Sequence, residues 1–202
     1  MLELLNLGVF VLRGINMRQK CKIYNLIIPF LLLIISLAHA EIFYVDNDNS
    51  CPGTGTINDP FCEIQLAVDT ASDGDIIKVA SGTYSELNNY GGLKQIVYIE
   101  KSVTIKGGYS SDFSEPPDPQ SNVTVIDAKG EGRAIYITGD ISPIIEGFYI
   151  TGGNASGLGG SEWGDAGGGI YISKATATIR NNNISNNIAS VGGGIYLDHS
   201  NS

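Results

Sequence analysis

Gly167-Gly168-Gly169-Ile170-Tyr171 recurs 25 residues later as Gly192-Gly193-Gly194-Ile195-Tyr196. The segment between the two copies, 179–189, has an earlier counterpart at 145–155. A sequence period of about 20–50 residues is typical of solenoids and other repeat arrays. The repeat therefore predicts a protein built from stacked copies of one small structural unit.

An aliphatic–tyrosine–aliphatic triplet accompanies the repeat. Because successive side chains of a strand point to opposite faces, we expect the aliphatic residues in the core and the tyrosines on the outer face. Stacking at about 4.8 Å would align these tyrosines in a column. The triplets are Ile135-Tyr136-Ile137, Ile170-Tyr171-Ile172 and Ile195-Tyr196-Leu197. The first interval is longer than the second, and we attribute the excess to a turn insertion at 157–165, which contains Trp163.

The local pattern predicts one helix and many short strands beyond residue 40. The helix is expected over 60–72, where an apolar face is followed by Ser72-Asp73-Gly74. Residues 81–84 are expected to form a turn. Strands are expected where short β-branched and aromatic runs are bounded by turn residues. These strands are 41–46, 75–80, 122–127, 133–138, 144–151, 169–173, 177–180, 183–185 and 194–198.

The first 40 residues have the form of a secretory signal peptide. A basic region at 18–22 precedes an apolar run at 27–37, and residues 38–40 match an A-x-A cleavage site. Met17 is the preferred start, because the residues before it do not fit this pattern. A membrane anchor is the alternative, but the apolar run is shorter than the roughly 20 residues that span a bilayer. We therefore expect a secreted protein, or one at the cell surface or outer membrane.

Charge and cysteine content limit the partners. The net charge is −9, and removal of residues 1–40, which hold four basic residues and one acidic residue, changes it to −12. An acidic surface repels nucleic acid, anionic lipid and, without an intervening cation, polyanionic sugar. Cys51 and Cys62 remain and are expected to form a disulfide in an exported chain. No further cysteine or clustered histidine supports a metal pair, so no metal site is expected.

Three runs near the N-terminus resemble a known fold family: Ile64-Gln65-Leu66-Ala67-Val68-Asp69, Gly74-Asp75-Ile76-Ile77-Lys78-Val79 and Gly82-Thr83-Tyr84. They look like the first segment of right-handed parallel β-helix proteins of the pectin-lyase-like superfamily. In that family a short helix caps the end of the solenoid, where core and strand edge would otherwise be exposed. The runs 103–109 and 125–127 are similar to the first coils of many exported bacterial members.

The resemblance implies an all-β solenoid, a right-handed parallel β-helix with a short N-terminal capping helix. Residues 41–82 would form the cap, with a strand, a disulfide loop and the helix, and residues 76–202 would form the coils. The run 183–195 also resembles the repeat of polymorphic outer-membrane proteins, although Ile184 replaces the phenylalanine of that repeat. We expect the coils to be truncated at the C-terminus, and membrane contact only through the missing region.

The first functional hypothesis is a non-catalytic surface module for adhesion, glycan binding or structural display. Trp163, Tyr136, Tyr171 and Tyr196 could stack on sugar rings and so bind a polysaccharide or a neighbouring cell surface. The alternative is that the tyrosines form a structural ladder and that Trp163 covers apolar surface near its own loop. No cofactor is expected. Calcium has little support, because the Asp46/Asp48 pair lacks the glycine and glutamate of a calcium loop.

The second hypothesis, implied by the superfamily resemblance, is a lyase or glycoside hydrolase that acts on acidic polysaccharide. A hydrolase needs two carboxyl groups about 5–10 Å apart. Glu146 is expected to pair with Arg180 as an ordinary salt bridge, and Asp127, Lys129 and Arg133 to share a turn. No catalytic residue is therefore assigned. The asparagine runs at 181–187 are expected to turn corners in left-handed conformations and to stack in ladders.

Overall fold

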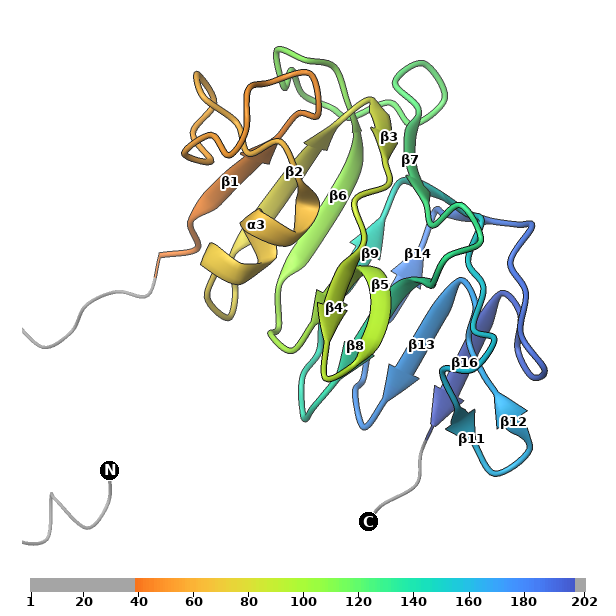
Figure 1. Ribbon diagram of the computed structural model, residues 1–202. Helices are drawn as coiled ribbons and strands as arrows, with labels where there is room; N and C mark the ends of the chain where they lie inside the picture. Colours follow the sequence, from red (N-terminus) through yellow and green to blue (C-terminus); the bar gives the residue numbers. More distant parts are fainter. Residues whose placement is uncertain (1–38, 199–202) are drawn as a thin grey trace, which may run out of the picture. The chain divides into compact units, whose positions relative to one another are not determined.

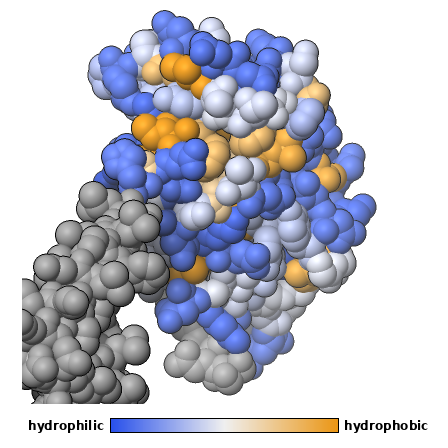
Figure 2. Space-filling view, turned by 90° about the vertical axis from the view of Figure 1, so that its left-hand side faces the viewer, coloured by the Kyte–Doolittle hydropathy of each residue, from blue (hydrophilic) through white to orange (hydrophobic). Residues whose placement is uncertain are grey.

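The computed structural model describes residues 39–198, and these form a mostly β structure with parallel sheets and little helix (Figure 1). The predicted signal peptide lies almost wholly outside the described residues, as do residues 199–202. Within residues 39–198, no helix is long and apolar enough to cross a membrane. The face on the β1 side is mostly hydrophilic and carries small, separate hydrophobic areas (Figure 2).

Three sheets are built from strands that lie far apart in the sequence. The first sheet consists, in spatial order, of β1 (Ile42–Val45), β2 (Ile76–Ala80), β6 (Thr104–Tyr109), β9 (Ile144–Glu146) and β14 (Thr178–Arg180). The second consists of β15 (Asn183–Ile184), β10 (Phe148–Thr151), β7 (Thr124–Asp127) and β3 (Gly82–Tyr84). The third consists of β16 (Ile195–Asp198), β13 (Ile170–Ser173), β8 (Arg133–Thr138), β5 (Leu93–Ile99) and β4 (Asn88–Tyr90). Every neighbouring pair in these sheets is parallel except β4–β5.

From β2 onward the chain visits the first, second and third sheets in a constant order. It passes through β6, β7 and β8, then β9, β10 and β13, then β14, β15 and β16. The triplets meet in register, with Ile135 opposite Ile170 and Ile170 opposite Ile195. This register confirms that the glycine–isoleucine–tyrosine phrase marks successive copies of one structural unit.

Stacked aliphatic side chains from the three sheets form one hydrophobic core. Ile77, Ile105 and Ile145 are in-register neighbours from the first sheet, and each is at most 2% exposed. Ile126 and Ile150 make the same contact in the second sheet. Burial of one such side chain stabilises the fold by about 1.5–3 kcal/mol. The in-register stacking therefore provides the main apolar driving force.

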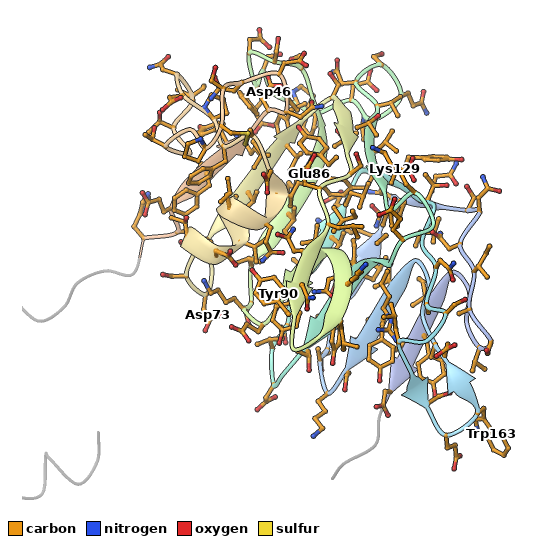
Figure 3. All side chains as sticks on the ribbon, in the orientation of Figure 1. Asp46, Asp73, Glu86, Tyr90, Lys129 and Trp163 are labelled. Atoms are coloured by element: carbon orange, nitrogen blue, oxygen red, sulfur yellow. A yellow bond between two sulfur atoms is a disulfide. The ribbon has the colours of Figure 1, made fainter. Side chains whose placement is uncertain are left out.

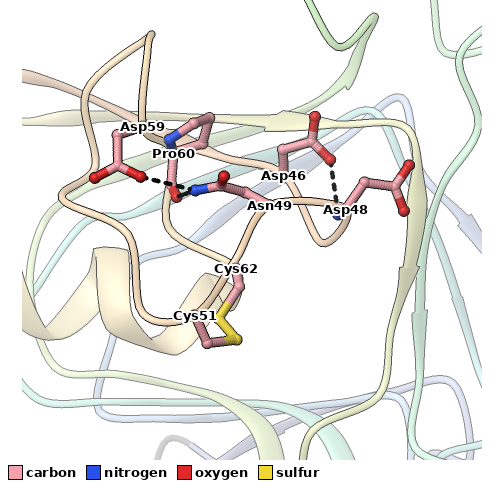
Figure 4. Close-up of a disulfide and its surroundings, with 7 residues drawn as sticks. All are labelled: Asp46, Asp48, Asn49, Cys51, Asp59, Pro60 and Cys62. Atoms are coloured by element: carbon pink, nitrogen blue, oxygen red, sulfur yellow. Dashed lines mark hydrogen bonds between the residues drawn. A yellow bond between two sulfur atoms is a disulfide. The ribbon is translucent and has the colours of Figure 1, made fainter.

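The single predicted helix is shorter than expected. The helix, α3, spans Ile64–Thr70 rather than 60–72. Phe61 cannot join it, because its backbone N–H donates to Tyr44 and its carbonyl accepts from Asp46, which extends the sheet beside β1. The predicted disulfide between Cys51 and Cys62 is present at the start of the helix (Figure 4). Asn49 donates to Asp59 and to the carbonyl of Pro60, which ties the same loop together (Figure 4).

Two further predictions of local structure are wrong. Residues 81–84 do not form only a turn, because Gly82–Tyr84 is strand β3, paired with β7. The predicted strand 144–151 is two strands, β9 and β10, separated by Gly147 at φ +82°. The other predicted strands agree with the structure to within two residues at each end. Strands β4, β5 and β6 and the short strands at Gly160–Ser161 and Gly164–Asp165 were not among the predicted strands.

The asparagine runs join neighbouring repeats. Asn181 and Asn186 have left-handed φ values of 55° and 56°, as expected at corners. Asn187 accepts from the N–H of Gly153 at 2.8 Å and donates to the carbonyl of Ile150 at 3.0 Å. Asn182 makes the equivalent pair of bonds with Phe148 and Ile145. The amides thus satisfy backbone groups of the preceding repeat, in place of the amide-on-amide ladder that the sequence suggested.

We predict that Asn187→Ala lowers the free energy of unfolding by about 2–4 kcal/mol, because it leaves one N–H and one carbonyl of the preceding repeat without a partner. Urea denaturation followed by circular dichroism measures this change. Asn183→Ala is the matched control, because Asn183 is exposed and its substitution should change stability by less than about 0.5 kcal/mol. Equal effects of the two substitutions would contradict the assigned role.

Candidate functional site

The predicted tyrosine column exists and is longer than the triplets indicated. Tyr98, Tyr136, Tyr171 and Tyr196 lie in register, with ring centroids 5.4, 5.1 and 5.9 Å apart. Tyr90 stacks on Tyr98 at 4.6 Å. Each ring of this column therefore contacts at least one neighbouring tyrosine ring, as in a structural ladder.

The prediction of an outward-facing column is wrong for Tyr171. Its side chain is only 6% exposed, and its hydroxyl donates to the carbonyl of Gly160 at 2.8 Å. Burial, followed by the charge of Asp198, raises the pKa of Tyr171 to about 12. Tyr136 and Tyr196 are half-buried. Tyr171 is thus unavailable for stacking on a ligand, because the insertion at 157–165 covers it.

The insertion itself forms a small hairpin that exposes Trp163. Strands β11 (Gly160–Ser161) and β12 (Gly164–Asp165) are antiparallel, and Trp163 lies in the turn between them. Its side chain is 76% exposed and points away from the body of the protein (Figure 3). The backbone N–H of Trp163 donates to the hydroxyl of Ser161, which donates in turn to the carbonyl of Gly164. Trp163 therefore projects from an ordered turn and does not cover its own loop.

Asp165 holds the base of this hairpin. Its two carboxylate oxygens accept from the N–H groups of Gly157 and Gly159, each at 2.8 Å. These two bonds lower the pKa of Asp165. One side chain thus closes the loop at the point where it leaves the sheet.

Arg133 holds the base of the hairpin through hydrogen bonds to its backbone carbonyls. Its Nε donates to the carbonyl of Ala166 at 2.9 Å, and its Nη2 donates to the carbonyl of Gly159 at 2.6 Å. The guanidinium carbon lies 4.7 Å from the ring centroid of Tyr171, which is within cation–π range. Burial lowers the pKa of Arg133. A side chain at Gly160 would collide with this arrangement, since its Cβ would lie 2.8 Å from Cε2 of the Tyr171 ring.

The expectation that Arg133 shares a solvated turn with Asp127 and Lys129 is therefore wrong. Arg133 begins strand β8 and is 1% exposed. Its neighbours in the sequence resemble a charged turn, but the insertion, 25 residues further along the chain, buries it. No signal in the local sequence could have identified this contact.

A groove lies beside charged residues of the first sheet. Glu146 and Arg180 form the predicted salt bridge at 2.8 Å, and Lys106 is the in-register neighbour of Glu146. Burial acts to raise the pKa of Glu146, but the hydrogen bonds from Arg180 and Asn181 outweigh it and lower the pKa. The groove has a volume of about 410 Å³ and is bounded by Pro117 and Pro119 in the loop between β6 and β7. It holds a single carboxylate, so it lacks the pair that a hydrolase needs.

A cleft between the predicted cap, 41–82, and the segment 83–96 has two carboxylates that sequence reasoning missed. Glu63 and Glu86 line a cleft of about 200 Å³ together with Asn47 and Asn88. Burial raises the pKa of Glu63, and the negative charge of Glu86 adds to the effect. Figure 3 shows Glu86 near the end of β3. The two glutamates are 23 positions apart, so no local motif connects them.

The described residues contain one group that resembles a metal site, formed by Cys51, Cys62 and Glu63. The disulfide removes both thiolates, so this group cannot act as a thiolate site for zinc. Asp46 accepts a hydrogen bond from the N–H of Asp48 at 3.0 Å, as in an Asx turn (Figure 4). These residues therefore have structural roles.

One protein-family model matches most of the chain. The model of the family described as Protein of unknown function (DUF1565) matches residues 45–201. The chain belongs to this family. The family is associated with parallel β-helix proteins, which agrees with the parallel sheets described above. No curated protein and no solved structure matches the chain.

We predict that the hairpin loosens in acid, because Asp165 must be ionised to accept both N–H bonds. Its folded pKa lies below the ordinary value of 3.8, so the stabilisation is present above that value and is lost as pH falls through the folded pKa. The fluorescence anisotropy of Trp163, the sole tryptophan, should stay constant from neutral pH to about pH 4 and fall below it.

Asp165→Asn should show low anisotropy at every pH, and Asp118→Asn, in the separate loop between β6 and β7, should behave as the wild type. An unchanged anisotropy in Asp165→Asn would show that Asp165 does not order the hairpin.

Proposed function

We propose that this protein is an exported β-helix module that binds glycan and has no catalytic activity of its own. The proposed architecture is a closed, right-handed parallel β-helix of the pectin-lyase-like type, with 41–82 as the cap and 76–202 as coils. The constant order of visits to three parallel sheets supports this architecture. The family association supports it as well.

The observation that carries the binding function is the exposed Trp163 on an anchored hairpin. A large aromatic side chain that is 76% exposed gains most when a ligand covers it. The buried Arg133 and the ionised Asp165 hold the base of the hairpin and so limit the conformational entropy that binding would remove. A flat, pre-positioned indole suits stacking on the apolar face of a sugar ring. Tyr136 and Tyr196 are secondary candidates for stacking on a sugar ring, because only part of each side chain is exposed.

Export is part of the same proposal. The first 40 residues have the pattern of a signal peptide, and the Cys51–Cys62 disulfide persists best in an oxidising compartment. The proposed location is the cell surface or the extracellular space, with a polysaccharide or a neighbouring cell surface as the partner. The net charge of −12 after cleavage favours uncharged glycans over polyanionic ones.

We predict that Trp163→Ala weakens glycan binding about tenfold or more, because the stacking surface is lost. Affinity electrophoresis in gels that contain neutral or acidic polysaccharides gives the comparison. Ligand quenching of Trp163 fluorescence gives an independent measure for the wild type. Glu162→Gln is the matched control, since it changes the neighbouring residue and leaves the indole in place. Equal retardation of wild type and Trp163→Ala in every gel would contradict the proposal.

A glycoside hydrolase is the second candidate function, and the cleft lined by Glu63 and Glu86 favours it. Glu63, with its raised pKa, has the property required of a general acid, and Glu86 could supply the second carboxylate. The cleft is small, and its lining residues lie far from Trp163 in the sequence. The hydrolase hypothesis therefore predicts effects for a different set of substitutions than the glycan-binding hypothesis.

If the cleft is catalytic, Glu63→Gln and Glu86→Gln should each lower the release of reducing ends at least about 10²-fold. Glu162→Gln should leave the rate unchanged. If the wild type releases reducing ends and both cleft variants release them at the same rate, this cleft is not the catalytic site. No release from any polysaccharide tested would leave glycan binding as the function.

A further inference from the structure

Two buried polar side chains lie side by side on strands β5 and β8 with hydrogen-bonding atoms that have no partner among the described residues. Gln95 is 0% exposed and Arg133 is 1% exposed. The unpaired atoms are Oε1 and Nε2 of Gln95 and Nη1 of Arg133. Buried polar groups in native proteins almost always have a partner, so each exception needs an explanation such as a bound water or ion.

The register places the two residues together. Gln95 and Arg133 are direct partners in the parallel β5–β8 ladder, about 4.8 Å apart between strands. The antiparallel strand β4 flanks Gln95 on its other side, and there Asn88 directs its amide to the carbonyl of Ile96. Asn88 therefore does not supply the missing partner.

The rest of the guanidinium is already committed. Nε and Nη2 donate to three backbone carbonyls, those of Ala166, Leu158 and Gly159. The carboxylate of Asp165 is engaged by two N–H groups, and no carboxylate in the described residues forms a salt bridge with Arg133. Both N–H groups of Nη1 and a positive charge without a contacting anion therefore remain in a buried environment, where an uncompensated charge is strongly unfavourable.

We propose that Gln95 and Arg133 bind a small monovalent anion of about the size of chloride. Nη1 of Arg133 and Nε2 of Gln95 are both donors, and an anion accepts from both at once while it neutralises the guanidinium. The near-complete burial of both side chains excludes a sugar or a large oxyanion. The site is separate from the exposed face of Trp163 and does not depend on glycan binding.

The test is thermal unfolding of the exported chain in chloride and in gluconate at equal ionic strength. Replacement of gluconate by chloride should raise the Tm in a saturable manner, by about 3–6 °C when chloride reaches about ten times its Kd. Gln95→Leu, which is close in size and removes no existing hydrogen bond, should abolish the chloride dependence, as should Arg133→Met. Lys94→Met is the matched control: it removes an exposed positive charge next to Gln95 and should keep the chloride dependence.

Because Arg133→Met also removes the support of the hairpin, Gln95→Leu decides the result if Arg133→Met does not fold. The same Tm for the wild type in chloride and in gluconate would overturn the proposal. A crystal grown in bromide gives a second measurement. An anomalous peak within hydrogen-bonding distance of Nη1 and Nε2 would confirm the site, and a water or a direct bond between Gln95 and Arg133 in its place would overturn it.

Discussion

The structure depends on parallel, in-register pairing between successive repeats. Each strand in the stack hydrogen-bonds to the equivalent strand of the next repeat, so a residue has its own counterpart as its nearest neighbour. Ile135, Ile170 and Ile195 follow one another in this way, and so do the tyrosines beside them. An aliphatic residue in one repeat therefore requires an aliphatic residue in the next. Where a corner interrupts the ladder, Asn182 and Asn187 supply the missing bonds.

The outer strands of such a stack have backbone groups without a partner in the sheet. The two outer strands described here differ in how far they are covered. At the β1 edge, the loop that leads to Phe61 pairs with Tyr44 and Asp46, and the disulfide closes that loop. The outer strand of the last described repeat, β16, has Ile195 at 36% and Leu197 at 51% exposure. The cap thus protects backbone groups and core together, which a polar loop alone could not do.

Departures from the repeat carry the candidate functions. The insertion at 157–165 buries Arg133 and Tyr171 and presents Trp163. In the cleft of Glu63 and Glu86, Glu63 precedes α3 and Glu86 lies between β3 and β4, so neither carboxylate belongs to a strand of the regular stack. A regular stack is occupied by its own neighbours above and below, so it leaves few side chains free to meet a ligand. A segment that leaves the stack is not limited in this way.

The sequence by itself determined the repeat, the tyrosine column, the disulfide pair, the left-handed asparagines and the presence of the Trp163 insertion. Each of these depends on local chemistry or on a period along the chain, and both can be read from residue order. Only the tertiary structure decided that Tyr171 and Arg133 are buried, that Gly82–Tyr84 pairs as a strand, and that Glu63 faces the same cleft as Glu86. These outcomes depend on which distant segment covers which side chain, and local sequence pattern does not encode that contact.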